Sequence, residues 1–200
     1  MGHHHGMRED GGQPTTRPLV VLVSGMPGSG KTTLARTLGD ALHLPVLSRD
    51  DIKTGMHVTV SSNDPAEVGR FAEDAFDVFF DVVEHLLMRG VSLVAEAAFH
   101  RDRPEQAVEL QDLADVAHLA LRLDTDTAVD RYAQRAARGE RHPAHADEQM
   151  VELLRSRAEL YRLDAPEPVL HVDTTDGYRP TMAAILAFIA GCRHHPTPHP

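Results

Sequence analysis

The sequence contains one cysteine, no tryptophan and only two lysines among its 20 basic residues. The single cysteine, Cys192, excludes an internal disulfide, which suits a reducing compartment. No apolar run approaches the roughly 20 residues that span a bilayer, and the N-terminal segment lacks the apolar stretch of a secretion signal. These absences predict a cytoplasmic protein without a membrane partner.

Positive charge is scarce as well. The 20 basic residues face 30 acidic ones, and the resulting net charge of −10 has the wrong sign for attraction to a phosphate backbone. An aromatic content of 4% leaves few surfaces on which bases could stack. Nucleic acid is therefore disfavoured as the main partner, while the oligomeric state stays open.

The length of the chain indicates one domain. Two hundred residues, 42% of them hydrophobic, suffice for one compact core and are too few for two comfortable ones. We assign this domain to residues 18–192. We expect residues 1–17, in which His3–His5 are either native or a tag, and the tail 193–200 to be flexible ends.

Apolar patterns within this domain alternate between those of strands and those of helices. Buried strands are predicted at 19–24, 45–48, 91–99, 116–124 and 168–173. Helices are predicted from 31 to before Pro45, from 65 to before Gly90, and at 104–113, 125–138, 147–163 and 180–190. Strands that alternate with helices need crossover connections, so we expect an α/β fold with three layers and a mainly parallel five-stranded sheet.

The segment SGMPGSGKTT, residues 24–33, joins the first strand to the first helix and matches the Walker A pattern G-x-x-x-x-G-K-[ST]. Its glycines let main-chain N–H groups face inward as an anion nest, to which the helix adds its positive end. In this pattern Lys31 reaches the β- and γ-phosphates of a nucleotide, and the Thr32 hydroxyl helps to hold Mg²⁺. The alternative is a flexible glycine turn with an exposed lysine. The expected nucleotide-binding residues here are Gly25, Met26, Pro27, Gly28, Ser29, Gly30, Lys31, Thr32 and Thr33.

Three carboxylates follow predicted strands. Asp50 and Asp51 lie just past the second strand, at the sheet edge where α/β folds bind ligands. One could accept the proton of an attacking hydroxyl while the other orients Mg²⁺, although either could instead cap a helix. Glu96 ends the third strand, where an apolar environment requires a metal, a hydrogen-bond donor or a substrate as partner.

The stretch 130–145 is locally basic in an acidic protein. Arg131, Arg135 and Arg138 recur at steps of four and three, which places them on one helical face. Such a face can close over a transferring phosphate, so we predict a helical lid at about residues 126–147. The competing interpretation is a solvated helix face that pairs with acidic neighbours.

These motifs together resemble those of the small P-loop kinases of the polynucleotide kinase, zeta toxin and chloramphenicol phosphotransferase group. The likeness spans about residues 19–190 and rests on GMPGSGKTT, RDDIK, VAEAAF, the R-x-x-x-R pair and VDTTDGY. It implies that Asp50 is the general base, that Lys53 contacts the substrate and that Arg135 meets the nucleotide phosphates. It also implies that the loop at 174–178 lies near adenine. The chain departs from the group in having lysine at position 53, where the group has arginine.

We therefore expect a kinase that uses ATP and Mg²⁺ to phosphorylate a hydroxyl of a small molecule such as a nucleoside, sugar or antibiotic. Acceptor specificity is expected in irregular loops at 53–63 and 97–104. Two alternatives remain: a polynucleotide 5′-hydroxyl kinase, and a non-catalytic module in which bound nucleotide regulates a partner.

The expected site residues fall into four groups. The expected catalytic residues are Asp50, Lys31 and Arg135, and the expected acceptor-binding residues are Asp50, Lys53, Glu96 and Arg138. The expected metal-binding residues are Thr32 and Asp51. Further nucleotide contacts are expected from Arg131, Arg135 and Thr174.

Overall fold

The computed structural model describes residues 17–60, 65–99, 105–138, 147–156, 158–161 and 168–193. The expected flexible ends, apart from residues 17 and 193, lie outside the described residues. Part of the expected lid, residues 139–146, lies outside them too, as do residues 100–104 of the expected specificity loop.

Five parallel strands form one sheet in the order β2-β3-β1-β4-β5. The strands are β1 (Leu19–Ser24), β2 (Val46–Ser48), β3 (Leu93–Glu96), β4 (Asp115–Arg122) and β5 (Val169–Asp173). The predicted parallel sheet is confirmed, although β3 is shorter than the apolar run 91–99 suggested. Because all the strands run the same way, their carboxyl ends meet at one edge of the sheet.

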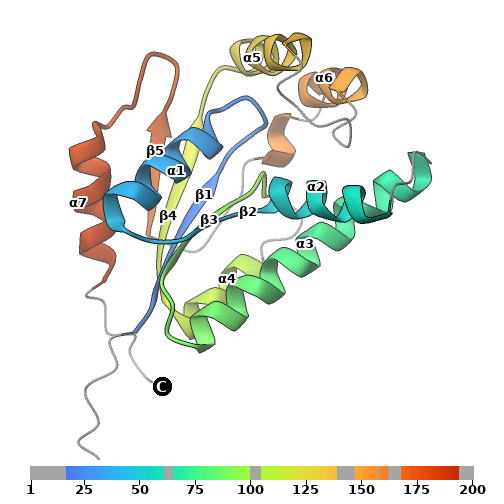
Figure 1. The fold of residues 1–200 in the computed structure, drawn as a ribbon. Coiled ribbons are helices and arrows are strands. Elements are labelled where there is room, and N and C mark those ends of the chain that lie inside the picture. The colour runs from blue at the N-terminus through green and yellow to red at the C-terminus, as the bar shows by residue number, and fades with distance from the viewer. Residues whose placement is uncertain are drawn as a thin grey trace, which may run out of the picture.

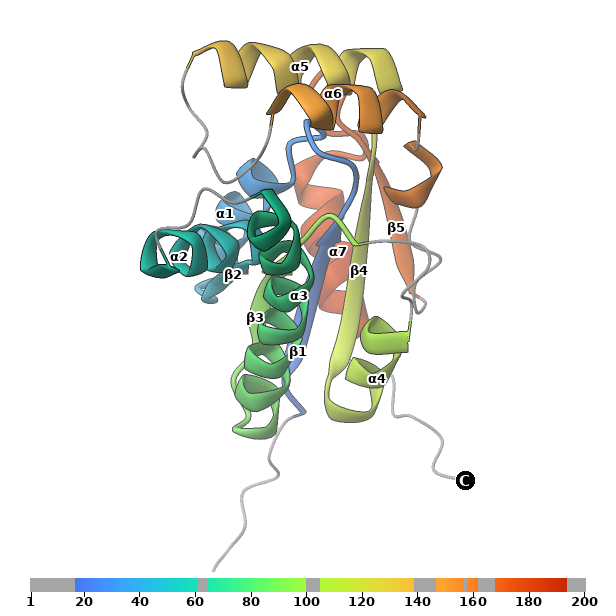
Figure 2. The ribbon, with the colours of Figure 1, turned by 90° about the vertical axis from the view of Figure 1, so that its right-hand side faces the viewer.

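Helices cover both faces of this sheet (Figure 1). They are α1 (Lys31–Leu42), α2 (Arg49–Val60), α3 (Pro65–Met88), α4 (Glu105–Leu113), α5 (Thr125–Ala137), α6 (Asp147–Ser156), the short 3-10 helix η2 (Ala158–Tyr161) and α7 (Met182–Cys192). Helices α1 and α7 lie on one face, and α3 and α4 lie on the other. Helices α5 and α6 lie beyond the carboxyl ends of the strands (Figure 2). The three-layer α/β architecture is therefore confirmed.

Strand β1 explains why the sheet needs cover on both faces. All six of its residues are buried. Val20 and Leu22 pack into a core with α3 and α4, whereas Val21 and Val23 pack into a second core with α1 and α7. A third cluster lies beneath α5 and α6, and Met26 joins it from the loop that follows β1. Because β1 is packed on both faces, the position at which the following loop begins is fixed.

The segment after β2 is helical, so the expectation of an irregular loop over 53–63 is wrong for its described part. Helix α2 begins at Arg49 and carries Asp50 and Asp51 in its first turn, where carboxylates interact favourably with the positive helix end. Neither aspartate precedes the helix as a cap. Glycine and β-branched residues later in α2 have low helix propensity, and contact with α3 compensates for it. None of the helices in the described ranges has the length and apolar character that a bilayer span requires.

His118 is a polar residue inside β4 that the sequence patterns did not single out. Its side chain is fully buried, and its Nε2 lies 2.6 Å from the Ser24 Oγ at the end of β1. Burial, with a smaller contribution from the neighbouring His171, lowers the pKa of His118 from 6.5 to about 4. The folded protein therefore keeps this imidazole neutral in a range where the unfolded chain binds a proton.

We expect the free energy of unfolding to fall as the pH is lowered from 6.5 towards 4, because only the unfolded state takes up this proton. Above pH 6.5 neither state binds the proton, so His118 causes no loss of stability there. The loss reaches roughly 3 kcal/mol once the pH has fallen to about 4. Urea unfolding of the wild type and of His118→Gln across this range measures the effect. Glutamine does not titrate, so the variant should lose less stability on acidification. Parallel pH profiles for the two proteins would contradict the assignment.

Candidate functional site

The loop between β1 and α1, residues 25–30, lies at the carboxyl edge of the sheet. Gly25, Gly28 and Gly30 have φ angles of 142°, 87° and 87°, which L side chains rarely adopt. A Cβ at Gly28 would lie 2.2 Å from the Ala128 carbonyl oxygen on α5. A Cβ at Gly30 would meet nothing within 4 Å. Gly28 therefore permits close contact with α5, whereas Gly30 borders open space.

The N-terminus of α1 opens from this loop. The first hydrogen bond of the helix runs from the Leu34 N–H to the Gly30 carbonyl at 3.1 Å. The N–H groups of Thr32 and Thr33 thus precede the helical ladder, and Gly30 has no side chain with which to cap them. The Ser29 Oγ is buried without a hydrogen-bond partner among the described residues. Donors gathered at a positive helix end are the chemistry that a phosphate requires.

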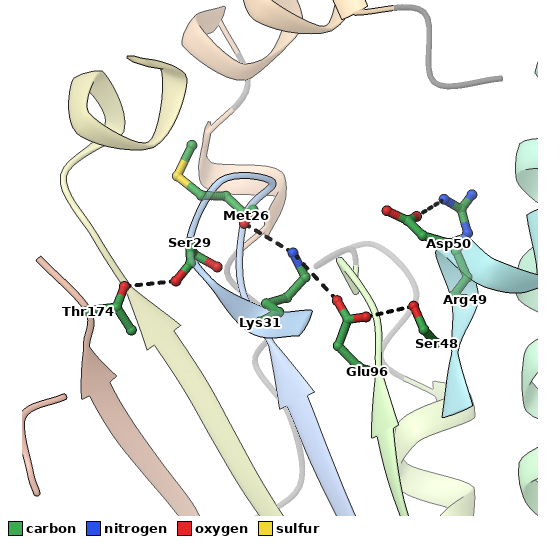
Figure 3. Close-up of polar contacts among 8 residues, drawn as sticks. All are labelled: Met26, Ser29, Lys31, Ser48, Arg49, Asp50, Glu96 and Thr174. Atoms are coloured by element: carbon green, nitrogen blue, oxygen red, sulfur yellow. Dashed lines mark hydrogen bonds and ion pairs between the residues drawn. The ribbon is translucent and has the colours of Figure 1, made fainter. Parts of the chain in front are cut away.

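Lys31 folds back over the loop towards β3 (Figure 3). Its Nζ donates to the Met26 carbonyl at 3.1 Å and lies 4.0 Å from the Glu96 Oε1. The other carboxylate oxygen of Glu96 accepts a hydrogen bond from the Ser48 Oγ at 2.7 Å. Burial raises the pKa of Glu96, while Lys31 and Ser48 oppose that rise. Of the partners expected for Glu96, the structure shows a hydrogen-bond donor, Ser48, and it adds the Lys31 ammonium, which was not expected.

Asp50 and its neighbours occupy the start of α2, at the same end of the sheet as Lys31 (Figure 3). The Asp50 side chain is half exposed, and its Oδ1 accepts from the Arg49 Nη1 at 3.3 Å. The Arg49 guanidinium lies 4.4 Å from the centroid of the Phe76 ring, a cation–π distance. Burial lowers the pKa of Arg49 and raises that of Tyr161. The sequence analysis gave no role to Arg49, Phe76 or Tyr161, although Arg49 belongs to the RDDIK motif and lies beside Asp50.

The remaining predicted residues of α2 lie in different environments. Asp51 is exposed, and Lys53, two residues further on, is buried with 8% of its surface accessible. The predicted metal residue of this helix is therefore exposed, whereas the predicted acceptor residue is enclosed by the fold.

The three arginines of the predicted basic face, Arg131, Arg135 and Arg138, have different environments. Arg131 donates from Nη1 to the Thr174 carbonyl at 3.0 Å and from Nη2 to the Thr175 carbonyl at 2.7 Å. Arg135 on the next turn of α5, and Arg138 directly after the end of this helix, are exposed. Thr174 also donates from Oγ1 to the Ser29 carbonyl at 2.8 Å. Thr174 thus contacts the loop after β1, and the Arg131 guanidinium is hydrogen-bonded to main-chain oxygens.

The oxygen ligands that the predicted metal residues offer decide which metal the site can fit. The described residues include no group of three or more His, Cys, Asp or Glu side chains that could hold a metal ion. Thr32 in the first turn of α1 and Asp51 in the first turn of α2 are separate oxygen donors. Mg²⁺ bound with a nucleotide needs few protein ligands, because phosphate and water oxygens complete its octahedron. The donor set therefore fits Mg²⁺ that arrives with a nucleotide, and it does not fit a cage made of protein ligands alone.

A parallel sheet with a three-glycine loop, a lysine at the loop's end and an open helix N-terminus defines a P-loop protein. A family described as an AAA domain matches residues 20–161, and the chain belongs to that family. No curated protein matches the chain.

Solved structures of kinases are similar to this one. A candidate kinase from Chloroflexus aurantiacus J-10-fl is 31% identical with a TM-score of 0.70, over 91% of this chain and 100% of that one. A gluconokinase from Sinorhizobium meliloti 1021 is 18% identical with a TM-score of 0.55, over 88% and 93% of the two chains. A shikimate kinase from Acinetobacter baumannii, in complex with shikimate, is 20% identical with a TM-score of 0.55, over 90% and 97%. The predicted small P-loop kinase fold is confirmed.

Proposed function

We propose that this protein transfers the γ-phosphoryl group of ATP to a hydroxyl of a small-molecule acceptor. The observation that carries the proposal is the placement of Lys31, Glu96 and Asp50 at one end of the sheet, with Lys31 at the end of the phosphate loop. The net charge of −10 favours a small acceptor over a nucleic acid. The gluconokinase and shikimate kinase folds support the same choice.

The phosphate loop, residues 25–30, and the first turn of α1 would bind the triphosphate. Its glycines and the first N–H groups of α1 would surround the β- and γ-phosphates, and the Lys31 ammonium would turn from Met26 and Glu96 towards them. The Thr32 hydroxyl and the Asp51 carboxylate would hold Mg²⁺, whose charge offsets that of the phosphate oxygens. Thr174, already bonded to the loop, would lie at its nucleoside side.

Asp50 would act on the acceptor. Its carboxylate would take the proton of the attacking hydroxyl as the new O–P bond forms and the bond from the γ-phosphorus to ADP breaks. Arg49, 3.3 Å from the carboxylate, would orient it during this step. Lys53, Glu96 and Arg138 would contact the acceptor, and Arg135 would neutralise charge on the transferring group.

A ³¹P NMR screen tests the proposal directly. The purified protein is mixed with ATP, Mg²⁺ and, one at a time, nucleosides, sugars, aminoglycosides and 5′-hydroxyl oligonucleotides. We expect a phosphate monoester and ADP to appear with a small acceptor. Transfer to oligonucleotides alone, with binding that weakens steeply as salt rises, would replace the proposal with a polynucleotide kinase. Tight ATP binding without transfer to any acceptor would instead support a regulatory module.

A further inference from the structure

Arg131 contacts main-chain atoms on a segment remote from it in sequence. Its two terminal nitrogens donate to the carbonyls of Thr174 and Thr175, which follow β5. The planar guanidinium presents parallel N–H groups that can reach two adjacent oxygens together, which the point charge of lysine does less well. The contact joins the first half of α5 to the segment beyond β5.

That segment, residues 173–179, is a closed turn. Asp173 and Arg179 exchange two main-chain hydrogen bonds of 2.8 and 3.0 Å across its base. The Asp173 Oδ1 accepts from the Thr175 N–H at 2.7 Å, which lowers the pKa of Asp173. The Thr174 N–H donates to the Arg122 carbonyl at the end of β4. The turn is therefore held internally and against the sheet.

The same turn is fastened to the phosphate loop. The Thr174 Oγ1 donates to the Ser29 carbonyl, and this hydroxyl is buried. Helix α5 meets the loop as well, because Gly28 lies against Ala128 and Met26 packs with Val129 in a shared apolar cluster. Three segments that would surround a nucleotide, namely the loop, the turn and the first half of α5, thus contact one another in pairs.

We propose that Arg131 is a positioning residue that holds the 173–179 turn and α5 in place beside the phosphate loop. The nucleoside side of the site is then assembled before a nucleotide arrives, while Arg135, on the next turn of α5, stays exposed and can meet a phosphate. Arg131 and Arg135 therefore have separate roles, the first on protein main chain and the second on phosphate. This division rests on the proposed nucleotide site.

A double-mutant cycle on ADP affinity tests the role of Arg131 without requiring catalysis. Isothermal titration calorimetry with Mg²⁺ and ADP is applied to the wild type, Arg131→Met, Thr174→Val and the double variant. We expect Arg131→Met to weaken ADP binding by about tenfold, as for the loss of hydrogen bonds to a charged donor. The double variant should bind ADP only slightly less tightly than the single variant with the lower ADP affinity, because both substitutions release the same turn. Additive losses would overturn the proposal.

Hydrogen exchange in the nucleotide-free protein gives an independent measurement. We expect Arg131→Met to speed exchange at the Thr174, Thr175 and Arg179 amides, which are bonded within or beside the turn. Arg131→Lys keeps the charge and most of the stem, and should restore protection only in part. Arg135→Met is the matched control and should leave these amides unchanged. Equal exchange in the wild type and Arg131→Met would overturn the proposal.

The two measurements separate this inference from the proposed function. A wild-type protein that binds ADP but phosphorylates no acceptor would refute the kinase activity. The double-mutant cycle and the hydrogen-exchange results would still test the positioning role of Arg131. A wild-type protein that binds no ADP would refute the nucleotide site and, with it, the separate roles of Arg131 and Arg135, whatever the exchange results show.

Discussion

Asp50→Asn is expected to retain ATP binding and to lower phosphoryl transfer by about 10²-fold or more. Asparagine has almost the same shape as aspartate but cannot accept the acceptor's proton. Asp50 lies on α2, outside the phosphate loop, and its half-exposed carboxylate can reach a ligand from solvent. The turnover number, measured with the acceptor found by the screen, and the ATP dissociation constant together check the result.

Asp51→Asn is the matched control, because Asp51 is the next carboxylate in the same helical turn. Because Asp51 is proposed to contact the metal, Asp51→Asn should raise the Mg²⁺ concentration needed for activity. Added Mg²⁺ should then recover much of the lost turnover. No Mg²⁺ concentration should recover Asp50→Asn. Undiminished turnover in Asp50→Asn would remove Asp50 as the base, and recovery of that variant by Mg²⁺ would exchange the roles of the two aspartates.

The parts of the fold that the sequence predicted well depend on local signals. Strand β1 was predicted with its observed limits, because its apolar run is bounded by Gly25 and both of its faces are buried. The start of α1 at Lys31 follows from the glycine pattern before it. Helix α2 was only an alternative, in which an aspartate caps a following helix, because its low-propensity residues form a helix only with tertiary support.

The contacts within the candidate site depend on strand register, which one sequence does not reveal. Ser48 and Glu96 are register partners on β2 and β3, although 48 residues separate them in the chain. That pairing supplies Glu96 with its donor, so neither residue alone could predict the contact. Helical spacing likewise grouped Arg131 with Arg135, and the position of the 173–179 turn then gave the two arginines different surroundings.

Lys31→Met is expected to abolish measurable transfer, with a loss of about 10³-fold or more, and to weaken ADP binding strongly. Methionine preserves much of the apolar stem but removes the ammonium that would contact the phosphates. Calorimetry with ADP and the ³¹P assay measure the two losses. Wild-type affinity and turnover in this variant would refute the assignment of the phosphate loop.

A structural cause for that loss has to be separated from a chemical one, because Lys31 also lies beside the buried Glu96. Without the cation, the pKa of Glu96 should rise further, and a protonated carboxyl would avoid an uncompensated buried charge. The double variant Lys31→Met, Glu96→Gln removes both charges and keeps an oxygen that can accept from Ser48. If it unfolds at the same urea concentration as the wild type but still binds no ADP, the lost affinity belongs to the missing ammonium. If it regains ADP binding, Lys31 serves mainly to neutralise Glu96, and the loop would bind phosphate through its main chain and helix end.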